Sequence, residues 1–143
     1  MIDVVALVHA AATWFMAGLI WFVQVVHYPL FPGVGDAGWN DYSRRHQRLT
    51  TLVVGPAMLV ELICAGLLLA MRPGVFTIAG AILLGLVWAS TFFIQVPLHA
   101  RLERGHDAAT RARLFRGLVA TNWARTFLWT ARGVIALLLL GGA

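Results

Sequence analysis

The amino-acid sequence predicts an all-α fold, an integral membrane four-helix bundle that forms a single transmembrane domain. Of the 143 residues, 60% are hydrophobic and only 12% are charged, about half the charged share of a soluble domain. The apolar residues also gather in four runs, each about as long as the 20 residues that a helix needs to cross a bilayer. A very apolar soluble bundle is the alternative, and the spanning length of the runs argues against it.

The first predicted span covers residues 4–28 and is followed by Pro29 and Pro32, which interrupt helical hydrogen bonding. The start, Met1-Ile2-Asp3, lacks the basic residues of a signal peptide, and the apolar run is longer than a signal peptide needs. We therefore expect this segment to remain in the mature protein as a helix.

The second predicted span covers residues 49–71, and its helix is expected to start earlier, near Asp41, with Asn40 as the N-cap. Arg72-Pro73-Gly74 then predicts a tight turn. The last two spans are predicted at residues 75–99 and 118–140.

The position of the arginines predicts the orientation of the bundle. The loop after the first span carries Arg44, Arg45 and Arg48. The loop after the third carries Arg101, Arg104, Arg111, Arg113 and Arg116. Only Arg72 lies between spans on the opposite side. The positive-inside rule then places loops one and three in the cytoplasm and both termini outside, in a bacterial inner membrane. Because topology explains these arginines, the net charge of +5 does not indicate binding to nucleic acid.

The two halves of the chain resemble each other weakly. Residues 21–24 (Trp-Phe-Val-Gln) are echoed by residues 92–95 (Phe-Phe-Ile-Gln), and each string is followed by Pro-Leu, a basic loop and another span. We interpret this pattern as two tandem two-helix hairpins. A duplicated hairpin favours a site near the axis that relates the two halves.

Each predicted span carries a stripe of polar residues at helical spacing. The four stripes comprise His9, Thr13, Gln24 and His27; His46, Thr50 and Glu61; Thr91, Gln95 and His99; and Asn122, Arg125, Trp129 and Arg132. Polar groups inside a membrane span are functional candidates, and their alternative role is to join helices by hydrogen bonds. The four stripes together predict a bundle with a polar interior.

Three histidines are predicted to lie at one level, near the cytoplasmic ends of the spans. They are His27, His46 and His99, and Tyr28 and Tyr42 belong to the same level. Imidazole is the commonest nitrogen ligand of metals, so the three histidines could bind a transition metal or a haem iron. The alternative is that they are interfacial side chains that reach water.

A second polar group is predicted deeper in the membrane. Glu61 lies well inside the second span, and Arg125 and Arg132 bracket its depth in the fourth, with His9 at the edge of the group. An unpaired charge there would be costly, so we expect Glu61 to pair with Arg125 or Arg132. The pair could specify the fold, or it could position a substrate together with Asn122, because arginine binds planar oxygens well.

The second half of the chain resembles a known family. Residues 95–99 (Gln-Val-Pro-Leu-His) and 122–126 (Asn-Trp-Ala-Arg-Thr) are similar to strings in small four-helix membrane proteins of the anthrone-oxygenase-like group. That group shows Asn-x-Pro-Leu-Asn, then Trp with a nearby His and Arg-Thr. Here His99 stands in place of the second Asn, and no histidine accompanies Trp123. The resemblance covers about half of the chain and implies oxygenase-like chemistry on an aromatic molecule.

The leading hypothesis is a small redox or oxygenase-like membrane protein that handles a lipid-soluble aromatic or quinone-like molecule within the bundle. The three histidines would bind a metal or haem or relay protons, and Glu61, Arg125 and Asn122 would position the substrate. One alternative is a non-catalytic accessory or assembly protein. A second is a small transporter or channel, which would require a homo-oligomer because four helices leave little room for a pore.

Overall fold

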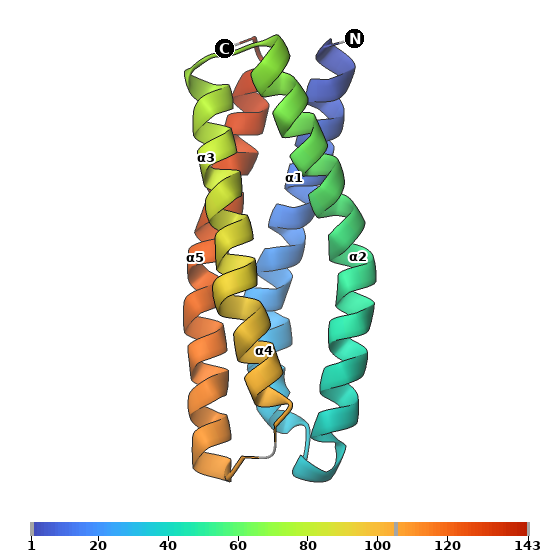
Figure 1. Ribbon diagram of the computed structural model, residues 1–143, viewed down its shortest axis with the longest axis vertical. Coiled ribbons are helices and arrows are strands. Elements are labelled where there is room, and N and C mark those ends of the chain that lie inside the picture. Colours follow the sequence, from blue (N-terminus) through green and yellow to red (C-terminus); the bar gives the residue numbers. More distant parts are fainter. Residues whose placement is uncertain (1, 105, 143) are drawn as a thin grey trace.

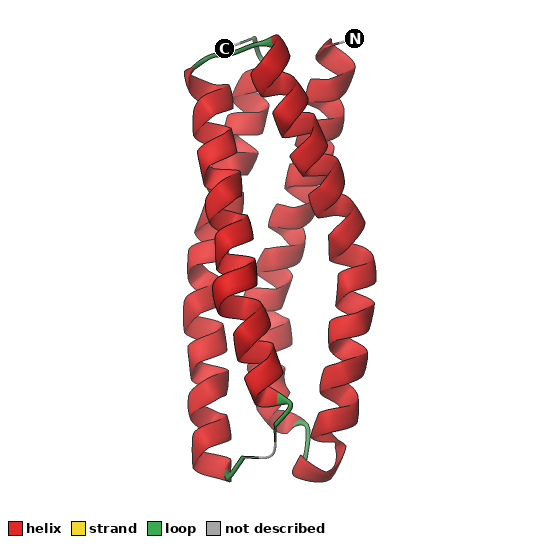
Figure 2. Ribbon diagram, in the orientation of Figure 1, coloured by secondary structure: helices red, strands yellow, loops and turns green. Residues whose placement is uncertain are grey.

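The protein consists of four long helical segments packed side by side (Figure 1), described by a computed structural model for residues 2–104 and 106–142. The first segment is α1 (Ile2–Phe22) with its extension through Val23–His27 and Tyr28–Gly33, and the second is α2 (Asp36–Met71). The third segment is α3 (Val75–Ser90), which continues through Thr91–Gln95 into α4 (Val96–Leu102). The fourth is α5 (Ala108–Leu140). The described residues contain no strand (Figure 2). All four segments are long and apolar enough to span a membrane, which confirms the predicted fold class.

The helices run past the predicted ends of the spans. The first segment continues beyond Tyr28 because the chain tightens there into a 3-10 helix, whose first turn accommodates Pro29. At α2 the prediction of Asn40 as N-cap is wrong: the helix begins at Asp36 and Gly35 is the N-cap. The extra turn is held by Trp39, which is buried and donates from Nε1 to the carbonyl of Leu102 over 2.7 Å.

Helix α5 begins ten residues before the predicted span, at the loop that follows α4. Its N-cap is Asp107, whose Oδ1 accepts a hydrogen bond of 2.8 Å from the backbone N–H of Thr110. This bond stabilises the ionised carboxylate and lowers the pKa of Asp107. The cap therefore fixes the start of α5 outside the apolar part of the bundle.

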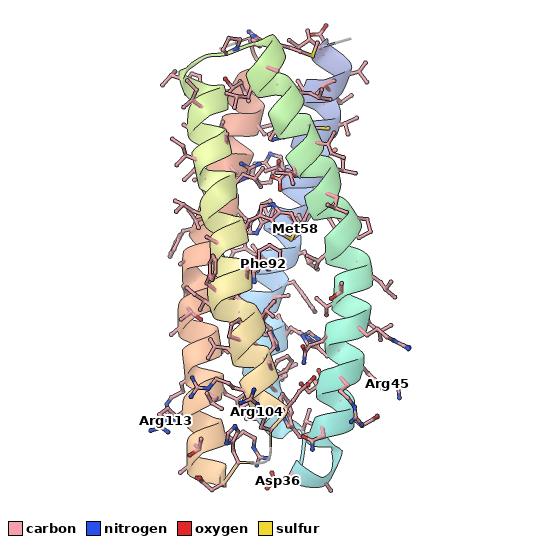
Figure 3. The ribbon with its side chains drawn as sticks, in the orientation of Figure 1. Asp36, Arg45, Met58, Phe92, Arg104 and Arg113 are labelled. Atoms are coloured by element: carbon pink, nitrogen blue, oxygen red, sulfur yellow. The ribbon has the colours of Figure 1, made fainter. Side chains whose placement is uncertain are left out.

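The two ends of the bundle differ in charge. Both termini lie at the end where α2 turns into α3, and we call it the terminal end (Figure 1). At the opposite end, Asp36, Arg45, Arg104 and Arg113 gather near the starts of α2 and α5 (Figure 3). We call it the arginine-rich end. The arginines that the sequence places in the first and third loops therefore lie at the same end of the folded bundle.

The buried apolar side chains form three layers along the bundle. The layer at the arginine-rich end includes Phe31 and Trp39, and the layer at the terminal end includes Leu68 and Leu139. The middle layer contains Met16, Ala17, Ile20, Met58, Val87 and Trp129. The outer surface is also apolar, as expected of a bundle that faces lipid. The layers leave room for polar side chains on either side of the middle one.

The first and third segments share a local distortion. Val23–His27 and Thr91–Gln95 are single π-helical turns, in which the N–H of Tyr28 bonds to the carbonyl of Val23 and that of Val96 bonds to Thr91. Such turns often occur at functional sites. Each turn contains one of the two glutamines matched between the halves of the chain, and each glutamine is buried against α5. The duplication itself stays a prediction.

Candidate functional site

The polar residues of the interior form two separate centres. The Glu61 centre, toward the terminal end, contains Glu61, Arg132, Thr13 and His9. The histidine centre, toward the arginine-rich end, contains His27, His46, His99, Tyr28 and Arg125. The middle apolar layer lies between them. The deep group predicted from the sequence is therefore divided, because Arg125 belongs with the histidines.

The Glu61 centre is a buried ion pair, in which Glu61 Oε2 and His9 Nδ1 have no partner among the described residues. Glu61 Oε1 accepts from Arg132 Nε over 3.0 Å, from Arg132 Nη2 over 2.6 Å and from the Thr13 hydroxyl over 2.7 Å. The remaining terminal nitrogen of Arg132 donates to the carbonyl of Gly80, and His9 Nε2 lies 3.3 Å from Nη2. Of the two arginines considered as partners of Glu61, Arg132 forms the pair.

No substrate fits beside the Glu61 centre. The cavity next to His9 measures about 10 Å³, which is at the lower limit for one water molecule. Glu61 and Arg132 are almost fully buried, and the Arg132 guanidinium also lies over the Trp129 ring at 5.8 Å. The geometry therefore favours a role in fixing how α1, α2 and α5 pack, rather than a role in binding a ligand.

Arg125 is positioned by a chain of amides. Its Nη1 donates to Asn122 Oδ1 over 3.2 Å, and Asn122 Nδ2 donates to Gln24 Oε1 over 2.9 Å. Gln24 in turn donates to the carbonyl of Val119. These residues are buried, and the Tyr28 hydroxyl lies beside the guanidinium. Asn122 and Gln24 thus hold Arg125 from one side and leave its other side toward the cavity described below.

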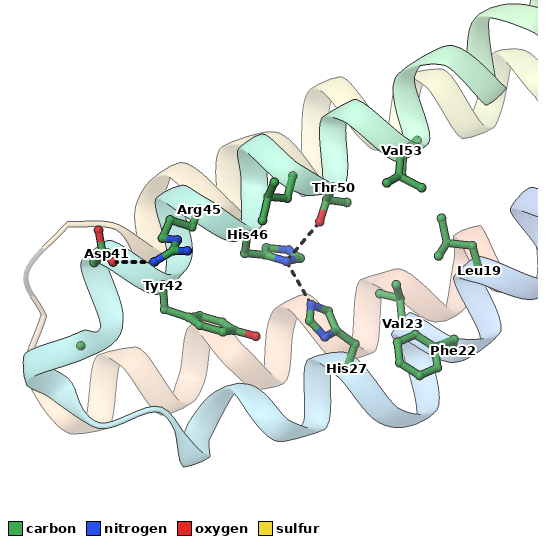
Figure 4. Close-up of a pocket in the computed structure, with 13 residues that line it drawn as sticks. Leu19, Phe22, Val23, His27, Asp41, Tyr42, Arg45, His46, Thr50 and Val53 are labelled. Atoms are coloured by element: carbon green, nitrogen blue, oxygen red, sulfur yellow. Dashed lines mark hydrogen bonds and ion pairs between the residues drawn. The ribbon is translucent and has the colours of Figure 1, made fainter.

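The three predicted histidines do meet, although they come from three different helical segments. His27 Nε2 lies 3.0 Å from His46 Nδ1, and the Thr50 hydroxyl lies 3.1 Å from the same nitrogen (Figure 4). The His46 and His99 ring centroids are 5.5 Å apart, and His99 Nε2 lies 3.0 Å from the Tyr28 hydroxyl. The result is one continuous cluster of titratable rings.

Two aromatic rings support the cluster. Phe31 is almost fully buried and meets the edges of His27 and His46 at centroid distances of 5.0 and 5.1 Å. Tyr42 lies nearly parallel to His46, at an interplanar angle of 8°. Phe31 was not among the predicted site residues. Its position four residues after His27, which places both on one helical face, is the signal that could have revealed it.

A groove and a cavity meet at His46. The groove between the first segment and α2 measures about 610 Å³, and its polar lining includes His27, Asp41, Tyr42, Arg45 and His46 (Figure 4). The cavity lies between α2 and the third segment and measures about 290 Å³. Its polar lining includes Tyr28, His46, Thr50, Gln95, His99 and Arg125. His46 therefore forms the wall between two spaces.

Several polar atoms around the cavity have no partner within the protein. They are Trp88 Nε1, Gln95 Oε1, His99 Nδ1 and Arg125 Nε, which are all buried and belong to residues that line this cavity. Buried polar groups in proteins nearly always make a hydrogen bond. Of the eight buried side-chain atoms without a partner among the described residues, these four line the cavity, whereas His9 Nδ1, Glu61 Oε2 and Trp129 Nε1 belong to residues at or next to the Glu61 centre. Only at this cavity do such atoms border a space large enough for a small ligand or several water molecules.

The predicted metal or haem ligation by the histidines is not supported by the geometry. Among residues 2–104 and 106–142, no three His, Cys, Asp or Glu side chains are arranged to hold a metal ion. His27 Nε2 and His46 Nδ1 are hydrogen-bonded to each other, and His99 Nε2 is hydrogen-bonded to the Tyr28 hydroxyl. A metal would require these rings to rotate.

Comparisons with family models, with curated proteins and with solved structures found no match for this chain. Its relationship to the anthrone-oxygenase-like group therefore stays a prediction. The histidine centre and its cavity are therefore the features of this chain that bear on its function.

Proposed function

We propose that this chain is a small membrane redox protein that binds the ring of a lipid-soluble aromatic or quinone-like molecule in the cavity between α2 and the third segment. The observation that carries the proposal is the set of unpaired buried polar atoms around that cavity. Much of the remaining lining is apolar, so the cavity suits a guest with a flat apolar ring and oxygen substituents.

The size and position of the cavity support a ring-shaped guest. A volume of about 290 Å³ lies at the lower end of small-molecule pockets, which start near 300 Å³. Met58 and Trp88 supply apolar walls. Phe92 and Val96, at the edge, are 56% and 51% exposed on the surface that faces lipid. An aliphatic tail could leave the cavity between the helices and remain in the bilayer.

The polar lining can supply protons to such a guest. A quinone takes up two protons together with two electrons when it is reduced, and it releases them when the quinol is oxidised. The electrons would come from an external reductant, and the chain's own side chains would handle only the protons. His99 and Tyr28 line the cavity and contact each other, and His46 connects the cavity to His27 in the groove. A neutral imidazole can accept a proton at one ring nitrogen and release one from the other. The groove also reaches Asp41 and Arg45 at the arginine-rich end, which the positive-inside rule places in the cytoplasm.

A transition metal or haem at His27, His46 and His99 is the second candidate, and it requires these rings to rotate away from their present hydrogen bonds. The observation that favours it is the convergence of three imidazoles from three segments, with ring centroids 4.7 and 5.5 Å apart. Such a group would supply the electrons that the side chains cannot. Absorption spectra of the oxidised and reduced protein, with elemental analysis, test it: a Soret band or stoichiometric metal lost in His99→Ala would support this candidate.

The quinone proposal is tested by titrating the purified protein in detergent with 2-methyl-1,4-naphthoquinone and measuring the quenching of tryptophan fluorescence. Trp88 lines the cavity, so a bound quinone should quench it. His99→Ala should weaken binding about tenfold, which corresponds to one lost hydrogen bond. His106→Ala is the matched control, because His106 lines neither space and donates a hydrogen bond to the carbonyl of Arg101. Absence of saturable binding would overturn the proposal and favour an accessory or assembly role.

The structure supports a transporter less well than it supports a ligand-binding protein. A path through one protomer would have to pass the middle layer, in which Met16, Val87 and Trp129 are almost fully buried. The two polar centres therefore lie on opposite sides of an apolar barrier. Solute passage through liposomes that hold the purified protein would revive this alternative.

A further inference from the structure

The two buried arginines of α5 differ in whether their charge is compensated. Arg132 is paired with Glu61 over 2.6 Å. Within the described part of the chain, the other ion pairs join Arg44 and Arg45 to Asp41 and Arg111 to Asp36, and none includes Arg125. Arg125 donates a hydrogen bond to the Asn122 amide oxygen, and the Tyr28 hydroxyl lies beside it; both are neutral groups.

An uncompensated guanidinium is unusual inside a membrane span. Arginine stays protonated in proteins, so it cannot escape the cost of burial by losing its charge. The Arg125 side chain is only 7% exposed, and its Nε is buried without a partner. The amide chain from Gln24 through Asn122 holds it in place. The protein therefore maintains a fixed positive charge at the wall of the cavity.

The cavity itself offers no negative charge to balance Arg125. Among the described residues that line it there is no aspartate or glutamate. The carboxylate of Glu103 accepts a hydrogen bond from Gln47 and does not line the cavity. Trp88 Nε1 adds an unpaired donor, and Gln95 Oε1 adds an unpaired but uncharged acceptor. Donors and a fixed cation in a confined apolar space produce a positive potential that attracts anions.

We propose that the guest of this cavity is an anion, a flat aromatic ring whose ionised oxygen, of the phenolate or hydroxyquinone type, pairs with Arg125. This inference rests on the proposed function and narrows it, because it selects the acidic members of the quinone and phenol class. The planar guanidinium binds planar oxygen groups well, and the low polarity around it strengthens the attraction. A neutral quinone would leave the charge of Arg125 uncompensated.

The test compares two probes that differ in charge and little in shape, 2-hydroxy-1,4-naphthoquinone, which is ionised at neutral pH, and its neutral 2-methoxy ether. Each is titrated into the purified protein, with quenching of tryptophan fluorescence as the measurement. The native protein should bind the anion at least about tenfold more tightly than the ether. Arg125→Gln should remove that preference, and Arg125→Lys should keep part of it. Arg113→Gln is the control, because it makes the same change in net charge at an exposed position of α5.

The outcomes separate this inference from the function on which it rests. Equal affinity for the two probes in the native protein would overturn the selection for an anion and leave quinone binding standing. This comparison needs no variant, so it remains decisive if Arg125→Gln does not fold. A preference for the anion that persists in a folded Arg125→Gln protein would also overturn the inference. Binding of neither probe would overturn both proposals.

Discussion

Replacing Glu61 with glutamine should destabilise the protein by about 3–5 kcal/mol, the usual cost of leaving one member of a buried ion pair without its partner. The contacts account for that size. The amide oxygen can still accept from Thr13, but the two hydrogen bonds from Arg132, of 3.0 and 2.6 Å, no longer end on a carboxylate, and the guanidinium charge is left without its counter-charge. Hydrogen bonds to charged groups contribute about 1.5–3 kcal/mol each. Arg132 cannot reach water, because its side chain is only 1% exposed.

Arg132→Leu in the same chain should recover part of that loss, because it removes the charge that Glu61→Gln leaves uncompensated. The coupling between the two changes should be about 2–3 kcal/mol. Arg125→Leu is the matched control, since it also removes a buried arginine from α5. Arg125 lies seven residues away, about 10 Å along the helix, and it contacts Asn122 rather than Glu61. Its coupling to Glu61 should stay within about 0.5 kcal/mol.

The assay is reversible unfolding in mixed detergent, followed by circular dichroism for the native protein, the three single variants and the two double variants. Strict additivity of Glu61→Gln with Arg132→Leu would refute the ion pair. Equal coupling to both arginines would refute the division of the interior into two centres, because Arg125 would then have to sense Glu61 across the middle apolar layer.

Three further predictions follow from the packing and the ends of the helices. Gly133→Ala should be less stable than Gly85→Ala by thermal unfolding, because a Cβ at Gly133 would lie 3.1 Å from an indole ring, whereas nothing lies within 4 Å of one at Gly85; equal stability would show that the ring moves away at no cost. Asp107→Ala should lower stability at neutral pH, and the deficit should fade in acid: the lowered pKa of Asp107 means that the ionised cap stabilises the fold above the usual aspartate pKa and stops doing so as the pH falls through the folded-state pKa. A deficit that is constant with pH would contradict this. Single cysteines at Gly35 and Arg104 should be labelled only from the cytoplasmic side, and periplasmic labelling of both would reverse the predicted orientation.

The class of the fold and the polar content of the interior could be predicted from the amino-acid sequence alone. The length and apolar character of a span are local properties of the chain, so they do not depend on which helices pack against it. The similar depth of His27, His46 and His99 along their spans could also be predicted, by counting residues along the expected helices. Their meeting in one cluster needed only that the helices stand side by side.

Which polar residues share a centre depends on how the four helical segments pack together. The sequence left Glu61 between two arginines because the depth of a residue in one span does not fix the stagger and rotation of its neighbours. Packing of the middle layer sets both, and it brings Arg132 to Glu61 and leaves Arg125 at the cavity. The start of α2 was likewise decided by a distant contact, that of Trp39 with the carbonyl of Leu102. Spans are fixed by the preference of a segment for lipid over water, whereas partners and cavities depend on how side chains from all four segments fill one shared interior.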